Sequence, residues 1–417
     1  MPEKEGDDMK IAILGAGARE HSIAKAFIDS GFDTLVVPGN DGMKWSGIPI
    51  KKVQETADEI LDATISFAPD IVIVGPTEYM VLGIVDKLKA KGIKVIGATS
   101  KSAMLEADKV FAKEFMVKHS IPTPRFRIVH TLSQLERALK EFEPPYVIKI
   151  PTLQGGKGSF ILPTISEALD IGAKVITSGF EGMWSEGLVV EEFTPGEEYA
   201  VQVLISSGDY VILPMVWEYQ RLYDHGRGPN TGGMGAVAPI RIDDRLFGLI
   251  KDLVGKTIKA MLKESLAYEG FLYLGVMAAN NGIKVLEYNV RLGDPETEAI
   301  VPLDSAGFVR MIKDTAFGRL PENLKPFGAS VALSLVSEGA PYHYTDSVLK
   351  IVGSMENIYF DHVQEEEGLL HVSGWRPCVV VGKGNTYNEA VEKAYKKAEE
   401  VIFEGKFYRR DIGESLL

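Results

Sequence analysis

Residues 285 to 298 have the sequence VLEYNVRLGDPETE, the most informative stretch of the chain. Apolar and polar side chains alternate from Leu286 to Arg291, and this alternation predicts a β-strand with one polar face. Glu287 and Asn289 stand two places apart, so their side chains share that face. Two oxygen donors on one face suit Mg²⁺, which keeps water or phosphate oxygens at its other positions. The alternative is an edge strand whose polar face is solvated.

The neighbouring residues extend this polar strand. Arg291 continues its polar face, and the acidic segment 293–298 follows at once. On the other side, Asn280-Asn281-Gly282 separates residues 271–278 from residues 284–289, as the turn of a hairpin does. We therefore expect a β-hairpin whose second arm carries the metal-binding side chains.

Two glycine-rich segments precede this hairpin. Residues 228–235, GPNTGGMG, offer backbone donors and close approach, which favours a loop that faces a substrate. Residues 154–158, QGGKG, follow an apolar strand predicted at 146–150 that contains Lys149. A buried lysine is costly unless it meets an anion, and the free N–H groups of the loop suit phosphate oxygens. Taken alone, the second segment is also compatible with a flexible hairpin tip.

Acidic residues mark the end of a strand predicted at 187–191. Glu191 and Glu192 close this strand, and Glu198 follows shortly after. A carboxylate at a strand end beside an apolar wall suits a ribose hydroxyl or an adenine amino group. A solvated pair of charges is the alternative.

Strands and helices alternate through the first hundred residues, as in a doubly wound parallel sheet. The strands are predicted at 10–14, 34–37, 71–74 and 94–96, and the helices at 19–29, 57–67 and 81–91. A long helix is predicted at 104–119, and residues 125–193 have the mixed helix and strand pattern of an α+β fold. Further strands are predicted at 199–206, 210–217, 332–336, 369–373 and 379–381, a loop at 223–239, and helices near 245–266 and 387–403.

The turn Gly15-Ala16-Gly17 after the first strand has three interpretations. A dinucleotide site needs Gly or Ala at position 20 and an acidic residue ending the second strand, but the chain has Glu20 and no such acid. The second interpretation is a tight turn that needs glycine for room. The third is an anion site at a helix N-terminus for another ligand, with Arg19 and His21 beside it.

The composition is that of a globular protein, with 45% hydrophobic and 25% charged residues and no apolar run long enough to cross a membrane. The net charge of −13 argues against a broad nucleic-acid or membrane surface. The first eight residues are polar and lack the features of a secretory signal. Cys378 is the single cysteine, which fits a reducing cytoplasm and a core position rather than a nucleophile.

Several segments together resemble phosphoribosylamine–glycine ligase, a family of the ATP-grasp superfamily. The resemblance rests on residues 228–235 and 287–297 together. It is supported by AREH at 18–21, PGN at 38–40, LE at 105–106 with Lys109, and RDIG at 410–413. It covers nearly the whole chain from Met9.

The resemblance implies an α/β and α+β multidomain protein. An N-terminal doubly wound α/β domain would span residues 1–103. A pair of ATP-grasp subdomains would span 104–329, with a lid subdomain at about 124–193. A small C-terminal α+β domain would span 330–417.

The implied activity is the ATP-dependent joining of glycine to 5-phosphoribosylamine, the second step of de novo purine synthesis. Glycyl phosphate would form first, and glycinamide ribonucleotide, ADP and phosphate would be released. ATP and Mg²⁺ or Mn²⁺ are the implied cofactors, and the implied partners are these small molecules, without nucleic acid or membrane. We expect a monomer or homodimer in the cytoplasm, with the loop at 155–158 closing over the phosphates.

The resemblance also implies roles by position. Contacts with ATP fall to Lys109, Lys149, Gly155, Gly156, Lys157, Gly158, Glu191, Glu192, Phe193, Thr194 and Glu198. Metal ligation falls to Glu287 and Asn289, and catalytic roles to Arg291, Asp294 and Asn230. Substrate binding falls to Gly17, Arg19, Asn40, Glu78, Asp294 and Arg376.

The chain departs from this family mainly on the substrate side. Thr77 stands where the family usually has Glu, with Glu78 one place later, and Gly226 and Pro151 replace acidic residues. Trp375 replaces a glycine, and a second metal-binding acid is not evident in 271–278. A diverged ATP-grasp ligase for another amine or acid is therefore the main alternative. A non-catalytic nucleotide-binding protein and a dehydrogenase are more distant ones.

Overall fold

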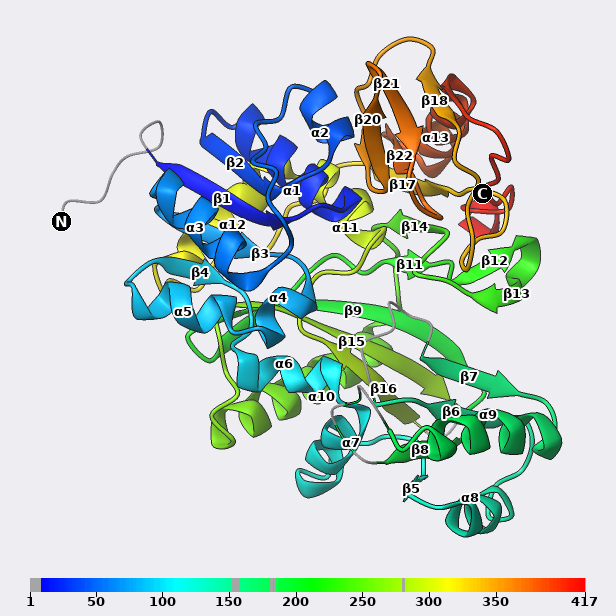
Figure 1. Cartoon of the computed structure of the whole chain (residues 1–417). Helices are drawn as coiled ribbons and strands as arrows, with labels where there is room; N and C mark the ends of the chain where they lie inside the picture. Colours follow the sequence, from blue (N-terminus) through cyan, green and yellow to red (C-terminus); the bar gives the residue numbers. More distant parts are fainter. Residues whose placement is uncertain are drawn as a thin grey trace.

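A computed structural model describes residues 9–151, 158–180, 183, 185, 187–279 and 282–416 of the chain. The N-terminal and C-terminal regions lie side by side in Figure 1, and the central region extends away from both. None of the helices in these described ranges has the length and apolar character that crossing a membrane requires.

The N-terminal region is built on a parallel sheet in the order β2-β1-β3-β4. Its strands are β1 (Lys10–Gly15), β2 (Asp33–Pro38), β3 (Ile71–Val74) and β4 (Lys94–Ile96). The helices are α1 (Ala18–Asp29), α2 (Asp41–Trp45), α3 (Ala57–Phe67), α4 (Thr77–Val81) and α5 (Ile84–Ala90). The predicted doubly wound sheet is confirmed, while the helix predicted at 81–91 is shorter because Gly83 interrupts it with φ +73°.

The single helix predicted at 104–119 is wrong, because the chain forms α6 (Ser100–Ala107) and α7 (Lys109–Lys118) instead. Asp108 between them is extended, with φ −121° and ψ 105°. Its carboxylate accepts hydrogen bonds from the backbone N–H groups of Val110 and Phe111, so it caps the second helix. The expected domain boundary at residue 103 falls inside α6.

A small antiparallel sheet in the order β5-β8-β6-β7 forms the expected lid region. Its strands are β5 (Phe126–Val129), β6 (Tyr146–Lys149), β7 (Ser159–Leu162) and β8 (Leu188–Glu192). Helices α8 (Leu132–Leu139) and α9 (Ile165–Thr177) pack on this sheet around a separate apolar core. Gly155, Gly156 and Lys157 lie outside the described residues, between β6 and β7.

The larger antiparallel sheet of the central region has the order β10-β9-β15-β16. Its strands are β9 (Glu197–Ser206), β10 (Asp209–Ile212), β15 (Gly270–Ala279) and β16 (Gly282–Asn289). Helix α10 (Asp244–Lys263) packs beside it, and α11 (Glu296–Ile300), the 3₁₀ turn η3 (Val301–Leu303) and α12 (Ser305–Ala316) follow the hairpin. The hairpin of β15 and β16 has the expected pairing, with Tyr273 opposite Asn289.

The strand predicted at 210–217 is wrong. The chain forms β10 and then β11 (Trp217–Glu218), which pair with different sheets. Pro214 lies between them and has no N–H group to donate to a continuous ladder.

The segment predicted as a loop at 223–239 is largely strand. It contains η2 (Asp224–Gly226), β13 (Arg227–Asn230) and β14 (Gly235–Ala238), and β13 pairs with β12 (Arg221–Tyr223). Gly235 brings β14 against its neighbour, because a Cβ there would lie 2.7 Å from the Ala332 carbonyl oxygen. The glycines in this segment therefore serve sheet packing as well as the turn.

Strand β14 belongs to a sheet that joins the central and C-terminal regions, in the order β11-β14-β17-β22-β19. The other strands are β17 (Ala329–Leu335), β19 (Ile358–Phe360) and β22 (Cys378–Gly384), and α13 (Tyr387–Glu400) packs on β17 and β22. A second sheet follows the order β20-β21-β18-β23, with β18 (Val348–Ile351), β20 (Val363–Glu366), β21 (Leu369–Val372) and β23 (Val401–Ile402). The chain ends in η4 (Glu414–Leu416).

Candidate functional site

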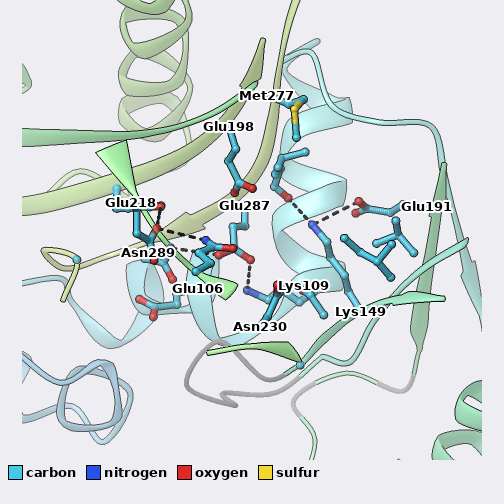
Figure 2. A pocket seen from close by; sticks show the side chains of 18 of the residues that line it. Glu106, Lys109, Lys149, Glu191, Glu198, Glu218, Asn230, Met277, Glu287 and Asn289 are labelled. Atoms are coloured by element: carbon cyan, nitrogen blue, oxygen red, sulfur yellow. Dashed lines mark hydrogen bonds and ion pairs between the residues drawn. The ribbon is translucent and has the colours of Figure 1, made fainter. Parts of the chain in front are cut away.

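One pocket lies between the small sheet, the large hairpin and the segment around β13 (Figure 2). It brings together most of the predicted site residues from positions far apart in the chain. Those that line it are Lys109, Lys149, Gly158, Glu191, Glu192, Phe193, Thr194, Glu198, Asn230, Glu287, Asn289, Arg291 and Asp294.

Two lysines meet β16, the strand that carries Glu287 and Asn289, inside this pocket. The Lys109 Nζ lies 3.3 Å from Glu287 Oε2, and Lys149 donates a 2.8 Å hydrogen bond to the carbonyl oxygen of Leu286 (Figure 2). Burial would raise the pKa of Glu287, but Lys109 and Lys149 outweigh it and lower the pKa to about 2. This end of the pocket thus holds a carboxylate that stays charged and two ammonium groups.

Asn289 lies on the same face of β16 as Glu287, and Arg291 follows two residues after the end of the strand. Asn289 Nδ2 is 3.5 Å from Glu287 Oε1, and Arg291 pairs with Glu106 at 3.2 Å. Glu106 is a site residue to which the sequence assigned no role, and it also accepts a 2.7 Å hydrogen bond from Thr77. The substituted position Thr77 is therefore buried against the site, while Glu78 is exposed on α4 and does not line the pocket.

The residues present fit a divalent cation. Glu287 and Asn289 both line the pocket, both offer oxygen atoms, and Asn289 is 8% exposed. Oxygen ligands of this kind are those that Mg²⁺ and Mn²⁺ accept.

Glu191 is held by two buried lysines. Lys113 Nζ lies 2.6 Å from Glu191 Oε1, and Lys149 Nζ lies 3.3 Å from Glu191 Oε2. Lys113 also donates a 2.6 Å hydrogen bond to Thr123 Oγ1, and burial, opposed by Glu191, lowers the pKa of Lys113 to about 8. The carboxylate of Glu191 is thus engaged within the protein. Lys113 escaped the sequence analysis, although its spacing of four from Lys109 places both on one helix face.

The residues after Glu191 form the outer edge of the pocket. Glu192 accepts hydrogen bonds from Arg125 Nε at 2.6 Å and from Lys284 Nζ at 2.8 Å. These two donors outweigh the effect of burial and lower the pKa of Glu192 to about 2. Glu192 therefore ties the small sheet to β16, Phe193 is partly exposed, and the hydroxyl of Thr194 is buried without a hydrogen-bond partner among the described residues.

Three further carboxyl groups line the pocket, and two of them, Glu218 and Glu296, were given no role from the sequence. The pocket walls and the Glu287 carboxylate raise the pKa of Glu198 to about 7. Burial and the carboxylates nearby raise the pKa of Glu218 well above its usual range and that of Glu296 to about 7. The pocket therefore has a cationic end, at Lys109 and Lys149, and an acidic end, at Glu218 and Glu296.

Asp294 links the pocket to a second cluster, at the junction with the N-terminal and C-terminal regions. Arg376 Nη2 lies 2.8 Å from Asp294 Oδ1 and 2.9 Å from Asp361 Oδ2. A Cβ at Gly17 would lie 3.7 Å from carboxylate oxygens of both aspartates. The cluster thus unites three of the predicted substrate-binding positions, Gly17, Asp294 and Arg376, with Asp361, which the sequence did not indicate.

A side chain of the protein itself occupies the anion site expected at the turn before α1. Gly17 N–H donates a 2.9 Å hydrogen bond to Glu20 Oε2, and Arg19 Nε donates to Glu20 Oε1 at 2.6 Å. A Cβ at Gly75 would lie 1.9 Å from Glu20 Oε1, so this glycine makes room for the same carboxylate. The anion at this helix N-terminus is therefore Glu20, in the position where a dinucleotide fingerprint would have a glycine.

Asn40 is engaged within the protein. Its side chain donates hydrogen bonds to the carbonyl oxygens of Ala16 at 2.7 Å and Phe360 at 3.0 Å, and its Oδ1 accepts from Met43 N–H to cap α2. His21 beside it accepts a 2.9 Å hydrogen bond from Phe360 N–H. Both side chains join the N-terminal region to the C-terminal one.

Comparison with known protein families gives a match along nearly the whole chain. Models of the phosphoribosylglycinamide synthetase N domain, ATP-grasp (A) domain and C domain match residues 9–106, 107–297 and 330–415 respectively. The three models occur in this order.

Curated relatives agree with this result. The phosphoribosylamine–glycine ligase of Thermotoga maritima is 40% identical over 97% of this chain and 99% of its own length. The enzyme of the same name from Caldanaerobacter subterraneus is 34% identical, again over 97% of this chain and 99% of its own.

Solved structures show the same fold. A crystal structure of the Thermotoga maritima ligase superimposes with a TM-score of 0.88 and 38% identity, covering 97% of this chain and 100% of the other. A biotin carboxylase domain from Hydrogenobacter thermophilus has a TM-score of 0.74 at 16% identity over 95% of this chain and 91% of its own, which indicates a shared fold alone. The chain belongs to the phosphoribosylglycinamide synthetase family, with its N, ATP-grasp and C domains in sequence.

Proposed function

We propose that the protein joins glycine to 5-phosphoribosylamine at the expense of ATP. The products would be glycinamide ribonucleotide, ADP and phosphate, and the reaction would be the second step of de novo purine synthesis. The observation that carries the proposal is the pocket in which Lys109, Lys149, Glu287 and Asn289 converge. Its support comes from relatives named phosphoribosylamine–glycine ligase, which align over nearly the full chain.

ATP would lie with its phosphates at the cationic end of the pocket. Lys109 and Lys149 would contact phosphate oxygens, together with the loop that ends at Gly158. The segment from Glu191 to Thr194 would hold the adenine through its backbone and the Thr194 hydroxyl, which has no partner in the described part of the chain. The carboxylates of Glu191 and Glu192 are already ion-paired. Glu198 would accept hydrogen bonds from the ribose.

A divalent cation would be held by Glu287 and Asn289. When bound, it would neutralise charge on the phosphates and help to orient them. The cation and Lys109 compete for the Glu287 carboxylate. Lys109 would therefore leave Glu287 when the cation binds and contact a phosphate oxygen instead. Separate activity titrations with Mg²⁺ and with Mn²⁺ identify the ion that serves.

The chemistry requires alignment and charge neutralisation rather than a protein nucleophile. The glycine carboxylate would attack the γ-phosphoryl group, and ADP would leave as glycyl phosphate forms. The amine of phosphoribosylamine would then attack the acyl carbon, lose a proton and displace phosphate. Lys149 and Arg291 would stabilise negative charge as it shifts, and Asn230 would donate a hydrogen bond to the reacting groups.

The phosphoribosylamine would bind where Asp294 meets Arg376. Arg376 and the N-terminal residue Arg19 would face its phosphate, and Asp294 its ribose or amine. The position of Gly17 beside both aspartates supports this placement.

Steady-state assays test the proposal directly. ADP release is measured with glycine and freshly generated phosphoribosylamine, and the ribonucleotide product is identified by mass spectrometry. We expect ADP release that requires both substrates. Release with a different amine or acid, and none with this pair, would instead establish a diverged ligase.

A further inference from the structure

Glu218 and Glu296 form the acidic end of the pocket. Within the described residues, neither carboxylate has a lysine, arginine or histidine within ion-pairing distance. The two cations that act on Glu296 are already engaged, because Arg291 pairs with Glu106 at 3.2 Å and Arg376 with Asp294 at 2.8 Å. In Figure 2 Glu218 lies beside Asn289, well apart from Lys149 and Glu191.

The Glu296 side chain is the second observation. It lines the pocket although only 2% of it is exposed, and its Oε2 has no hydrogen-bond partner among the described residues. Gly293 gives it space, since a Cβ at that position would lie 2.3 Å from Glu296 Oε1. A buried acceptor of this kind is costly unless a ligand satisfies it.

Neutral donors hold Glu218 in place but leave one oxygen available. Glu218 Oε2 accepts hydrogen bonds from Tyr273 OH and from Gln220 Nε2, each at 3.2 Å. Its Oε1 faces the Gly232–Gly233 backbone, where a Cβ at Gly233 would lie 3.4 Å away. Burial is the largest cause of the raised pKa values of Glu218 and Glu296. The carboxylates of Glu296 and Glu198 add to it at Glu218, and that of Asp294 adds to it at Glu296, where the charges of Arg291 and Arg376 act against it.

We propose that Glu218 and Glu296 bind the ammonium group of the amino-acid substrate and select against acids that lack one. The inference rests on the proposed function and deepens it. The substrate carboxylate has to reach the phosphoryl group at the Lys109 and Lys149 end, so its ammonium end points toward the acidic end. An ammonium offers three donors, which suit the open oxygens of these two carboxylates.

The surrounding backbone favours a small amino acid. Gly233 has φ +106°, and a Cβ there would lie 2.4 Å from Pro295 Cδ and 2.9 Å from the Asp294 carbonyl oxygen. This segment therefore packs tightly against residues 294–295 and closes the pocket directly beside Glu218.

The test is the kinetics of Glu218→Gln and Glu296→Gln with glycine varied at saturating ATP and phosphoribosylamine. We expect the KM for glycine to rise at least tenfold in each variant, while the KM for ATP changes less than threefold. Glycolate, in which a hydroxyl replaces the ammonium, gains relative to glycine by at least tenfold in kcat/KM. Glu367→Gln, an exposed acid far from the pocket, is the control, and the thermal midpoint of each variant establishes that it is folded.

Two results would overturn the inference. One is an unchanged KM for glycine in a folded Glu218→Gln enzyme. The other is a shift in the Mg²⁺ concentration dependence with no change for glycine, which would assign the two carboxylates to a metal ion. Both require an active wild type, so they differ from a failure of the proposed function, in which the wild type itself releases no ADP with glycine and phosphoribosylamine.

Discussion

At the scale of single residues, the pocket depends on charges that are paired before any ligand arrives. Glu287 faces Lys109, Glu191 faces Lys113 and Lys149, and Glu192 faces Lys284. Breaking a buried pair by removing one partner leaves the other charge unpaired, which costs more than the pair itself is worth.

Glu287→Gln tests the proposed metal-binding role of Glu287. The amide keeps the size of the side chain but removes the charge that a divalent cation requires. We expect kcat to fall by about 100-fold or more and the requirement for Mg²⁺ to shift to higher concentration, with circular dichroism unchanged. Near-normal activity at limiting Mg²⁺ would refute the assignment.

Lys113→Met tests the buried pair with Glu191. Methionine fills similar space, but Glu191 loses its 2.6 Å contact, so we expect a loss of about 3–5 kcal/mol in the free energy of unfolding. Urea denaturation measures it. Lys118→Met on the same helix removes an exposed ion pair with Glu264, and its cost should be much the smaller of the two. Equal losses in the two variants would contradict this account.

The sequence alone predicted that Glu287 and Asn289 share one face of a strand, because period-two alternation is a local property. It did not reveal Glu106, Lys113, Glu218 or Asp361, whose roles depend on partners far away in the chain. Lys113, for example, is a helical lysine like many others until β8 places Glu191 against it. Glu191 and Asn40 were predicted to contact ligands, but their side chains are engaged by protein groups. No local sequence pattern specifies those partners.

At the scale of elements, the sheets explain which local predictions were right. The parallel strands of the N-terminal region and the hairpin of β15 and β16 were predicted because their alternation and turn residues are local. The errors at 210–217 and 223–239 share one cause, because strand pairing partners are not encoded locally. The error at 104–119 is different, since Asp108 ends one helix and caps the next within a few residues.

Gly235→Ala tests the close approach of β14 to β17. A methyl group there would lie 2.7 Å from the Ala332 carbonyl oxygen and 2.4 Å from Ile412 Cδ1. We expect a loss of about 1–3 kcal/mol in unfolding free energy, measured by urea titration. The matched control is Gly248→Ala on α10, where a Cβ meets nothing within 4 Å, so helix propensity should give a gain of up to about 1 kcal/mol. A stabilised Gly235→Ala protein would contradict the packing argument.

At the scale of the whole molecule, the N-terminal and C-terminal regions are joined by buried polar contacts around Phe360. His21 Nδ1 accepts from its N–H and Asn40 donates to its carbonyl oxygen. Burial, followed by the charge of Lys25, lowers the pKa of His21 to about 3. His21 is therefore neutral in the folded protein and accepts a hydrogen bond that its protonated form could not.

This contact predicts a pH dependence of stability. The unfolded chain binds a proton at His21 below about pH 6.5, whereas the folded chain does not until about pH 3, so His21 contributes a loss of stability as pH falls through this range. His21→Asn, whose amide oxygen can accept the same bond, removes this contribution. Between pH 8 and pH 5 we expect the stability advantage of the wild type over His21→Asn to shrink by about 2 kcal/mol, measured by urea titration.

The contradicting outcome is a stability difference between the wild type and His21→Asn that stays constant from pH 8 to pH 5.

The sheet that runs through β11, β14, β17, β22 and β19 also has a consequence for synthesis on the ribosome. Strand β14 emerges with β11 on one edge, but its other neighbour is encoded beyond α12 and the outer strands later still. Until those residues leave the exit tunnel, β14 has an open edge of the kind that recruits other chains. The last quarter of the polypeptide thus supplies the strands that cover this edge. Nascent chains halted before β17 should therefore be those that chaperones retain.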